Sequence, residues 1–152
     1  MGIPSPIKIK KDGIEYISNV DRANYNIAQL TRAALRDVGK LVRKRVIQEI
    51  KKLPGMKRSK RPYKSTLYKV PYWKTGQNPK VQIGIKHGTW YGERQEFGTH
   101  RMKRKGFLTD TTRGLINDIR LIEGKYLKEV ENENRAMGLI NEAEYYPKEN
   151  EE

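Results

Sequence analysis

The sequence predicts a single α+β domain over residues 1–152, in which two long amphipathic helices pack on a small antiparallel β-sheet. Two observations predict it: apolar residues recur at three- and four-residue steps in two long segments, and two short segments between them alternate apolar and polar residues. The chain has the length of one ordinary domain. We expect the core within about 21–130, an N-terminal arm or strand in 1–20 and a C-terminal tail in 138–152.

The first long segment predicts a helix from Asp21 to Leu53, about 50 Å in length. Asn19 or Asp21 can cap its start, and the Pro54-Gly55 pair ends it. With one slip in the middle, the apolar residues follow one face of this helix, and the opposite face is basic. The apolar residues are Ile27, Leu30, Ala34, Val38, Leu41, Ile47 and Ile50.

Two strand-like segments follow this helix. Residues 63–73 are rich in Tyr and alternate apolar with polar side chains, and residues 80–86 alternate Val and Ile with Lys and Gln. The sequence KTGQNPK between them supplies turn residues, so the two segments predict a β-hairpin. Pro71 should lie at an edge or beyond the end of the first strand, because proline has no N–H to donate. Residues 7–18 can add an extra strand to this small sheet.

The second long helix is predicted to begin near Thr109, with Thr109 or Asp110 as its cap, and to end where the tail begins. A short helical turn that runs into Gly98 precedes it. Gly114 and Gly124 each weaken the long helix by about 1 kcal/mol relative to Ala, unless close packing requires them. Its apolar residues step by three and four without a break: Leu108, Thr111, Leu115, Ile119, Ile122, Tyr126 and Val130.

The charge of the chain is large and uneven. The net charge is +14, and residues 131–152 contain seven acidic against two basic residues, so this acidic C-terminal tail carries −5 and residues 1–130 carry +19. Such a balance favours anionic partners, and the tail can shield the basic body, dock on a basic neighbour or be a solvated end. The absence of cysteine excludes disulfides and thiolate metal sites. No apolar run approaches the ~18–20 residues of a membrane span, so no membrane partner is expected.

Two basic clusters are the strongest functional signal in the sequence. One consists of Lys57, Arg58, Lys60 and Arg61, and the other of Arg101, Lys103, Arg104 and Lys105. Tyrosines and tryptophans lie near both clusters, and basic residues interleaved with aromatic ones suit phosphate contact and base stacking. Alternatively, the aromatic residues fill a thin core and the basic residues are solvated. Both interpretations stay open at this point.

Few residues suit catalysis. A metal-dependent nuclease site could combine His87, Glu93, Glu96 and His100, but no metal-binding motif with the necessary spacing is present. The glycines of residues 88–98 also lack the spacing of a phosphate-binding loop. We therefore expect no enzyme and no catalytic, cofactor-binding or metal site. A nuclease would lose cleavage on substitution of Glu96 or His100.

The segment WYGERQEFGTHRMKRKGFL, residues 90–108, resembles the signature of the head–tail joining, or tail-completion, proteins of the neck of long-tailed bacteriophages. The order of elements also resembles that family over about residues 21–130. Two features depart from the family pattern: the loop HRMKRKG replaces a segment that commonly contains Pro and Ala, and Gln95 occupies a position that is often apolar. The matching residues are Tyr91, Glu96, Phe97, Gly98, Thr99, Phe107 and Leu108.

This resemblance implies a non-enzymatic structural virion protein that forms a ring, expected to be hexameric, with DNA passing through it. Its expected neighbours are a head-completion or connector protein and a tail terminator or tail-tube protein, with transient contact to viral DNA. It implies a place in the neck of the virion, and in the host cytoplasm during assembly. Apart from the resemblance, the thin core favours an obligate assembly. The alternative is a free, non-specific nucleic-acid-binding protein, which would bind DNA or RNA tightly and in a salt-dependent way.

The shared motif is expected to build a corner of the chain. Gly98 can adopt a positive φ and turn the chain sharply. Phe97 and Phe107 can bury on either side of the loop, and Glu96 can bond the backbone of the turn or a basic neighbour. The basic loop is interpreted as an interface or lumen element that meets an acidic protein face or the phosphate backbone, with protein contact favoured because a tight grip on DNA would oppose its passage. Reversing its four basic residues to Glu should block head–tail joining.

Overall fold

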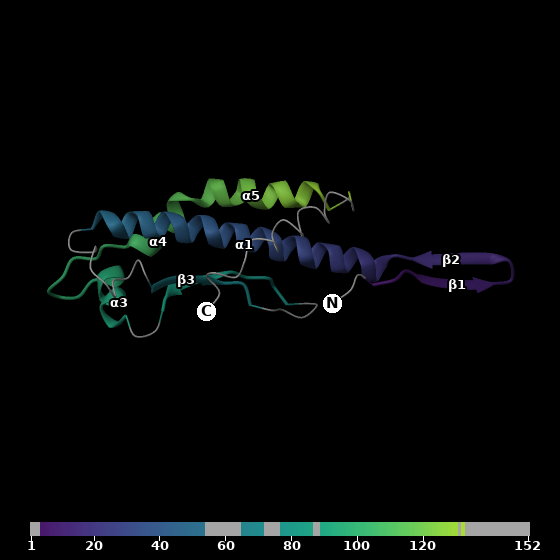
Figure 1. Ribbon diagram of the computed structural model, residues 1–152, viewed down its shortest axis with the longest axis horizontal. Helices are drawn as coiled ribbons and strands as arrows, with labels where there is room; N and C mark the ends of the chain where they lie inside the picture. The colour runs from purple at the N-terminus through teal and green to yellow at the C-terminus, as the bar shows by residue number, and fades with distance from the viewer. Residues whose placement is uncertain (1–3, 54–64, 72–76, 87–88, 131, 133–152) are drawn as a thin grey trace.

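The computed structural model describes residues 4–53, 65–71, 77–86, 89–130 and 132, and these residues form an α+β fold. They contain four helices and two separate two-stranded antiparallel sheets. The molecule is elongated, and the long helix α1 forms its axis (Figure 1). None of the described helices is both long enough and apolar enough to cross a membrane.

Helix α1 spans Val20–Lys52 and begins after Asn19, one residue from the predicted start. Its length of about 50 Å agrees with the prediction. The buried stripe runs in steps of four without the predicted slip: Leu30, Ala34, Val38, Val42, Val46 and Ile50. Three residues of the predicted face lie beside this stripe instead, because Ile27 is exposed and Leu41 and Ile47 are only half-buried. Val42 and Val46, which the prediction omitted, are fully buried.

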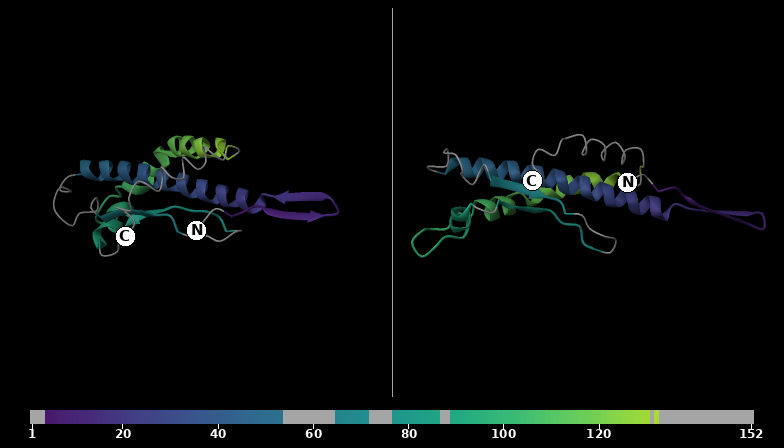
Figure 2. Two further views of the ribbon diagram at one scale, coloured as in Figure 1. Left: turned by 45° about the vertical axis from the view of Figure 1, so that its right-hand side comes forward. Right: turned by 60° about the horizontal axis from the view of Figure 1, so that its bottom comes forward.

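The buried stripe is wide because other elements cover α1 on two sides. Helix α5 runs along one side and the β3–β4 sheet along the other (Figures 1 and 2). Tyr126 packs with Leu30, Ala33 and Ala34. Farther along α1, a second cluster joins Val38, Val42, Val46 and Ile50 to Phe107 and Leu115. The core is therefore a strip along α1.

The second long helix of the prediction is two helices. Helix α4 spans Phe107–Gly114 and helix α5 spans Ile116–Lys128, with a break at Leu115. The hydroxyls of Thr111 and Thr112 donate to the carbonyls of Phe107 and Leu108, a pattern that weakens a helix interior. The predicted start was also wrong, because α4 begins two residues before Thr109 and its N-cap position is Gly106. The tail, 138–152, lies outside the described residues.

The predicted β-hairpin is confirmed. Strand β3, Thr66–Lys69, pairs with strand β4, Gln82–Ile85, and Tyr68 lies opposite Ile83. Pro71 follows the end of β3, as expected. The sheet approaches α1 closely at Gly39, where a Cβ atom would clash with the ring of Tyr68.

The N-terminal strands form a hairpin of their own and do not extend the β3–β4 sheet, which corrects the expectation of an extra strand there. Strand β1 spans Ile7–Lys11 and strand β2 spans Ile14–Ser18. The turn between them has positive φ at both Asp12 (52°) and Gly13 (80°), the signature of a two-residue hairpin turn that matches strand twist. This hairpin, which we call the arm, projects beyond the N-terminal end of α1 (Figure 1).

Candidate functional site

The residues that carry the family resemblance build one closed corner between helix α3, Trp90–Phe97, and helix α4. Glu96 is only 3% exposed, and its carboxylate accepts hydrogen bonds from the backbone N–H groups of Leu108 (2.8 Å) and Thr109 (2.9 Å). The hydroxyl of Thr109 donates a third bond to it, at 2.6 Å. A carboxylate at this place accepts hydrogen bonds from N–H groups that have no partner within the helix. Its negative charge is also attracted to the positive end of the helix dipole. Glu96 is therefore the cap of α4, although it lies in another helix.

Gly98 makes the sharp turn that was predicted for it, with φ at 79°. A Cβ atom there would lie 2.8 Å from the backbone nitrogen of Arg104 and 2.9 Å from the carbonyl oxygen of Met102. The returning chain bonds to the end of α3, because Lys105 donates its N–H to the carbonyl of Gln95 (2.9 Å). The loop from 98 to 106 is thus closed at its base by backbone hydrogen bonds.

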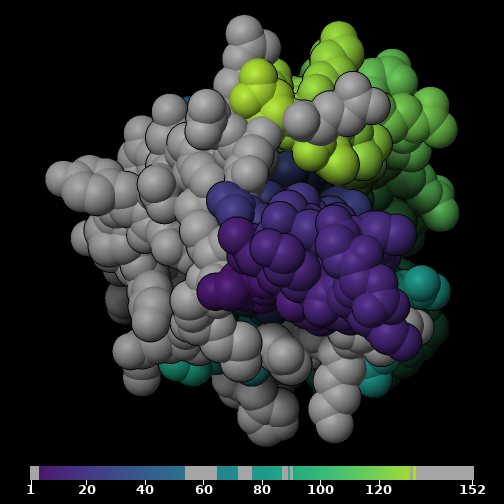
Figure 3. All heavy atoms as spheres, turned by 90° about the vertical axis from the view of Figure 1, so that its right-hand side faces the viewer, coloured from purple at the N-terminus to yellow at the C-terminus, as the bar shows by residue number. Residues whose placement is uncertain are grey.

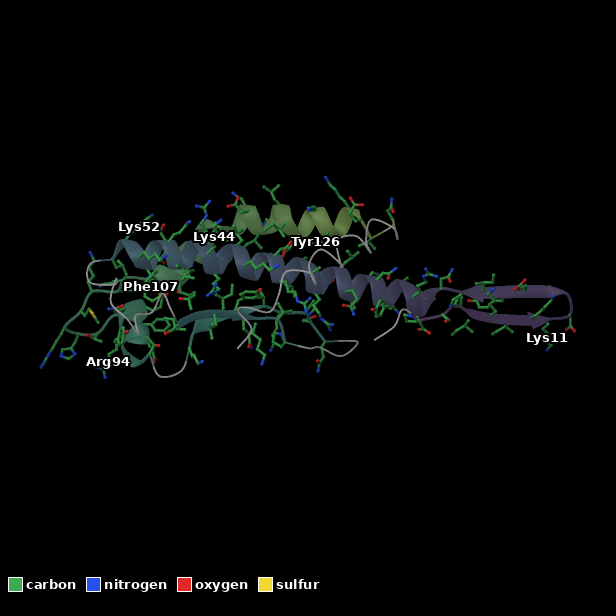
Figure 4. All side chains as sticks on the ribbon, in the orientation of Figure 1. Lys11, Lys44, Lys52, Arg94, Phe107 and Tyr126 are labelled. Atoms are coloured by element: carbon green, nitrogen blue, oxygen red, sulfur yellow. The ribbon has the colours of Figure 1, made fainter. Side chains whose placement is uncertain are left out.

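The two phenylalanines of the motif have different environments. Phe107 is buried against the C-terminal half of α1, as predicted, and Figure 4 shows it between α1 and the corner. The prediction for Phe97 was wrong, since this side chain is 69% exposed. Glu96 points into the corner, and the next residue of a helix lies about 100° farther around its axis, so Phe97 points outward. The other motif residues, Tyr91 and Leu108, are half-buried.

The tip of the basic loop is closed by backbone hydrogen bonds. Thr99 and Met102 exchange backbone hydrogen bonds of 2.9 and 3.1 Å, so His100 and Arg101 form a tight turn. The Nε atom of Arg101 donates to Nε2 of His100 at 3.0 Å. This geometry presents Arg101 and the exposed Lys103 outward.

The other two basic residues of the loop are less available. Arg104 forms an ion pair with Asp110 at 2.7 Å, between Nη2 and Oδ1. Lys105 is half-buried, and its backbone closes the loop. The structure therefore places Arg101 and Lys103 together at an exposed tip and turns Arg104 back toward α4. The other predicted basic cluster, Lys57, Arg58, Lys60 and Arg61, lies outside the described residues.

A second basic surface lies on α1 beside the β3–β4 sheet. A groove of about 400 Å³ runs along α1 and reaches Tyr68 of β3. Arg43, which lines this groove, donates from Nε to the carbonyl of Thr66 at 2.8 Å. The basic face predicted for this helix includes Lys40, Arg43, Lys44 and Lys51, although the groove itself was not predicted. It is lined by Lys40, Arg43, Lys44, Ile47, Gln48, Lys51 and Tyr68.

The nuclease residues do not form a metal site in the part of the chain that the structure describes. Glu93 and Glu96 border a hollow of about 800 Å³ beside the corner, but the carboxylate of Glu96 caps α4. His100 is at the tip of the basic loop, and His87 lies outside the described residues. Among the described residues, no group of three or more His, Cys, Asp or Glu side chains could hold a metal ion.

Comparison of the chain with known protein families, with curated proteins and with solved structures finds no match. The corner, the exposed loop tip and the basic groove are the features of the described structure that bear on function.

Proposed function

We propose that this chain is a structural protein of a bacteriophage neck, which forms a ring that joins the head connector to the tail tube and lets DNA pass through. The observation that carries the proposal is the corner. Glu96 and Gly98, which the resemblance shares, form a hydrogen-bonded support whose exposed tip carries Arg101 and Lys103. The support suits a docking element, because the Glu96 carboxylate is bonded inside the corner while Phe97 and the basic tip face outward.

Uncovered apolar side chains support self-assembly. Ile14 and Leu121 are each 73% exposed and Leu127 is 71% exposed, while the core is a strip along α1. These side chains lie on two separate elements, the arm and α5, and burial of each would be favourable. Contacts between copies in a ring would supply the missing burial.

The basic loop is the proposed contact with an acidic face of a neighbouring neck protein. A rim contact between opposite charges mainly raises the rate and specificity of association. A protein contact suits the tip better than a grip on DNA, because phosphate contacts strong enough to hold DNA would oppose its passage.

The double variant Arg101→Glu/Lys103→Glu tests whether this loop makes the proposed contact. Arg104 is left unchanged, since a carboxylate there would repel Asp110. Particles assembled without this chain should be joined to tails by the purified natural chain but not by the variant, as counted by electron microscopy. Lys69→Glu/Lys80→Glu, a double charge reversal at exposed positions of the sheet region, is the matched control and should retain joining. Normal joining by the loop variant would contradict the proposed contact.

The basic groove on α1 favours a second candidate, a free, non-specific nucleic-acid-binding protein. That function requires tight binding of DNA by the isolated chain, with affinity that falls steeply as salt increases. The joining function requires weak binding of DNA and assembly into rings. Gel-shift titrations over a salt series, combined with mass measurement of the purified chain, separate the two candidates.

A further inference from the structure

The basic groove concentrates positive charge along one side of α1. Its lining residues on this helix follow one another at steps of three and four, so their side chains form a single stripe about 17 Å long. Among the described lining residues, none is Asp or Glu. The stripe contains the cations Lys40, Arg43, Lys44 and Lys51.

These cations differ in their surroundings. Arg43 is half-buried and is fixed to β3 through the carbonyl of Thr66. Lys40 is also half-buried and lies 3.7 Å from Asp37, which offsets part of its charge. Even with this carboxylate counted, four cations minus one anion leave +3 at the groove. Lys44 and Lys51 are exposed, so they are the cations that a ligand in solution reaches first.

The groove offers charge without an exposed apolar anchor. Tyr68 is only 6% exposed, and Ile47 is half-buried. Protein partners usually bind through apolar or aromatic hot spots, and single-stranded nucleic acid stacks its bases on exposed aromatic side chains. The described lining residues meet neither requirement. They suit a ligand that is held by charge and hydrogen bonds alone, such as a row of phosphates.

The length and continuity of the stripe also suit a regular row of phosphates. Helix α1 has no break between Val20 and Lys52, so the lysines of the stripe lie along one axis. A length of about 17 Å corresponds to about five base pairs of duplex DNA, at roughly 3.4 Å for each phosphate along one strand. Gln48, which is exposed between Lys44 and Lys51, adds an amide donor of the kind that contacts phosphate oxygens.

We propose that the basic groove on α1 binds the phosphate backbone of double-stranded DNA without regard to sequence, with Lys44 and Lys51 as its principal contacts. Two to four phosphate contacts are few, so binding is weak, with a dissociation constant on the order of 10⁻⁴ to 10⁻⁶ M. Contacts of this strength let a protein slide along DNA. The inference goes beyond the proposed function, because joining through the basic loop requires no DNA-binding site.

The first experiment compares two pairs of neighbouring cations on α1. Lys44→Gln/Lys51→Gln removes two charges from the groove, and Arg45→Gln/Lys52→Gln removes two exposed charges of the same helix outside it. Figure 4 labels Lys44 and Lys52 on the C-terminal half of α1. Fluorescence anisotropy of a labelled DNA duplex, measured over a salt series with the full chain, gives the affinity and its salt dependence.

The groove variant should bind the duplex about tenfold more weakly at low salt, and its slope of log affinity against log salt should be shallower by about 2. The control variant should stay close to the natural chain in both measurements, and two duplexes of unrelated sequence should give the same result. Circular dichroism checks that both variants remain folded. Equal losses in the two variants would show that net charge alone attracts DNA, and would overturn the groove as the site.

The second experiment locates the DNA without changing the charge of the chain. The natural chain has no cysteine, so Gln48→Cys can carry a photo-activated cross-linker beside the groove. Asn117→Cys, an exposed amide position on α5, is the matched control. Figure 3, which views the molecule from the end that carries the arm, shows α5 at the top and parts of the sheet region below. Cross-linking to the duplex should be several-fold greater from position 48, and equal cross-linking from 117 would overturn the inference.

Competition identifies the class of ligand. Unlabelled duplex should displace the labelled duplex better than single-stranded DNA or poly-glutamate at the same concentration of charge. Equal displacement by poly-glutamate would assign the groove to an acidic protein segment instead. Stronger displacement by single-stranded DNA would assign it to single strands, and either result would overturn the proposal.

These outcomes are distinguishable from failure of the proposed function. If the natural chain joins heads to tails but the groove variant binds DNA as well as the natural chain does, the groove inference fails and the joining function remains. If the groove variant alone loses DNA binding but the natural chain does not join particles, the groove inference stands and the joining function fails. A natural chain with no measurable DNA binding at low salt and no joining activity overturns both.

Discussion

At the scale of single residues, the carboxylate of Glu96 links two consecutive helices, α3 and α4, across the loop at 98–106. It belongs to α3 but caps the N-terminus of α4, and the loop between them has to return for this cap to form. Gly98 and Gly106 give the loop its two left-handed positions, with φ of 79° and 54°. The corner therefore connects α3, the loop and α4, so a substitution within it should affect both helices.

Glu96→Ala should lower the free energy of unfolding by about 2 kcal/mol, because the N–H groups of Leu108 and Thr109 lose a charged acceptor. Glu96→Gln, whose amide oxygen can still accept, should lose less. Urea unfolding followed by circular dichroism measures both. Glu93→Gln, at an exposed position of the same helix, is the control and should change stability by less than about 0.5 kcal/mol. An unchanged urea midpoint for Glu96→Ala would show that the cap is not stabilising.

At the scale of elements, α1 is the surface on which α4, α5 and the β3–β4 sheet pack. Helix α5 is fixed to it by apolar contacts and by a hydrogen bond of 2.5 Å from the Tyr126 hydroxyl to the Asp37 carboxylate. Asp37 also lies 3.7 Å from Lys40, in an ion pair that is partly exposed and adds little. The bond between Tyr126 and Asp37 therefore sets the position of α5 along α1.

Tyr126→Phe should lower the free energy of unfolding by about 1–2 kcal/mol, since it removes the donor and leaves the ring in place. Asp37→Ala should cost a similar amount, and the double variant should cost less than the sum of the two. A thermodynamic cycle from urea unfolding measures this coupling. Tyr16→Phe, on the exposed arm, is the control and should have little effect in dilute solution. Additive costs within error would contradict a direct link between α1 and α5.

The elements that could be predicted are those that pack through one face, because their apolar residues then recur at regular steps along the sequence. The alternation in 80–86 predicted the β3–β4 hairpin, and the spacing of Leu30, Ala34 and Val38 predicted α1. The apolar period did not predict the break at Leu115, because Ile119 and Ile122 continue it beyond this point; the weak helix former Gly114, directly before the break, was the one signal. The spacing of apolar residues predicts which side of a helix faces the core. It does not indicate where threonine hydroxyls bond to backbone carbonyls of the same helix.

At the candidate site, the sequence predicted the turn of the backbone better than it predicted which side chains are buried. A glycine before a returning loop indicated the positive φ of Gly98. The exposure of Phe97 was not predictable, because it depends on which neighbour turns into the corner. The arm is an instructive case: Asp12-Gly13 is a strong hairpin signal, yet the same residues also fitted an extra strand of the main sheet. Only the three-dimensional arrangement separates these two possibilities.

At the scale of the whole molecule, the net charge of +14 over an elongated body is the dominant long-range term. Like charges oppose both folding and the approach of a second copy. The groove on α1 and the tip of the basic loop are local concentrations of this field.

Raising sodium chloride from about 0.1 M to about 1 M, which shortens the Debye length from about 10 Å to about 3 Å, should raise the urea midpoint and strengthen self-association. Screening weakens the repulsion within and between chains while the apolar contacts persist. Equilibrium unfolding and sedimentation at matched protein concentrations measure the two effects. Potassium chloride at the same ionic strengths should give the same result and controls for effects specific to sodium. A lower midpoint at high salt would indicate that attractive ion pairs dominate instead.

The arm and the basic loop lie at opposite ends of the rod formed by α1 (Figures 1 and 2). This separation gives the subunit a polarity, because one end carries the amphipathic arm and the other the cationic loop tip. Copies arranged side by side in a common orientation would form an assembly with two different rims. Each rim would suit a different neighbour, so the assembly would have a direction. Loss of one rim would leave the other competent, and partially assembled particles should then accumulate with a single, defined open side.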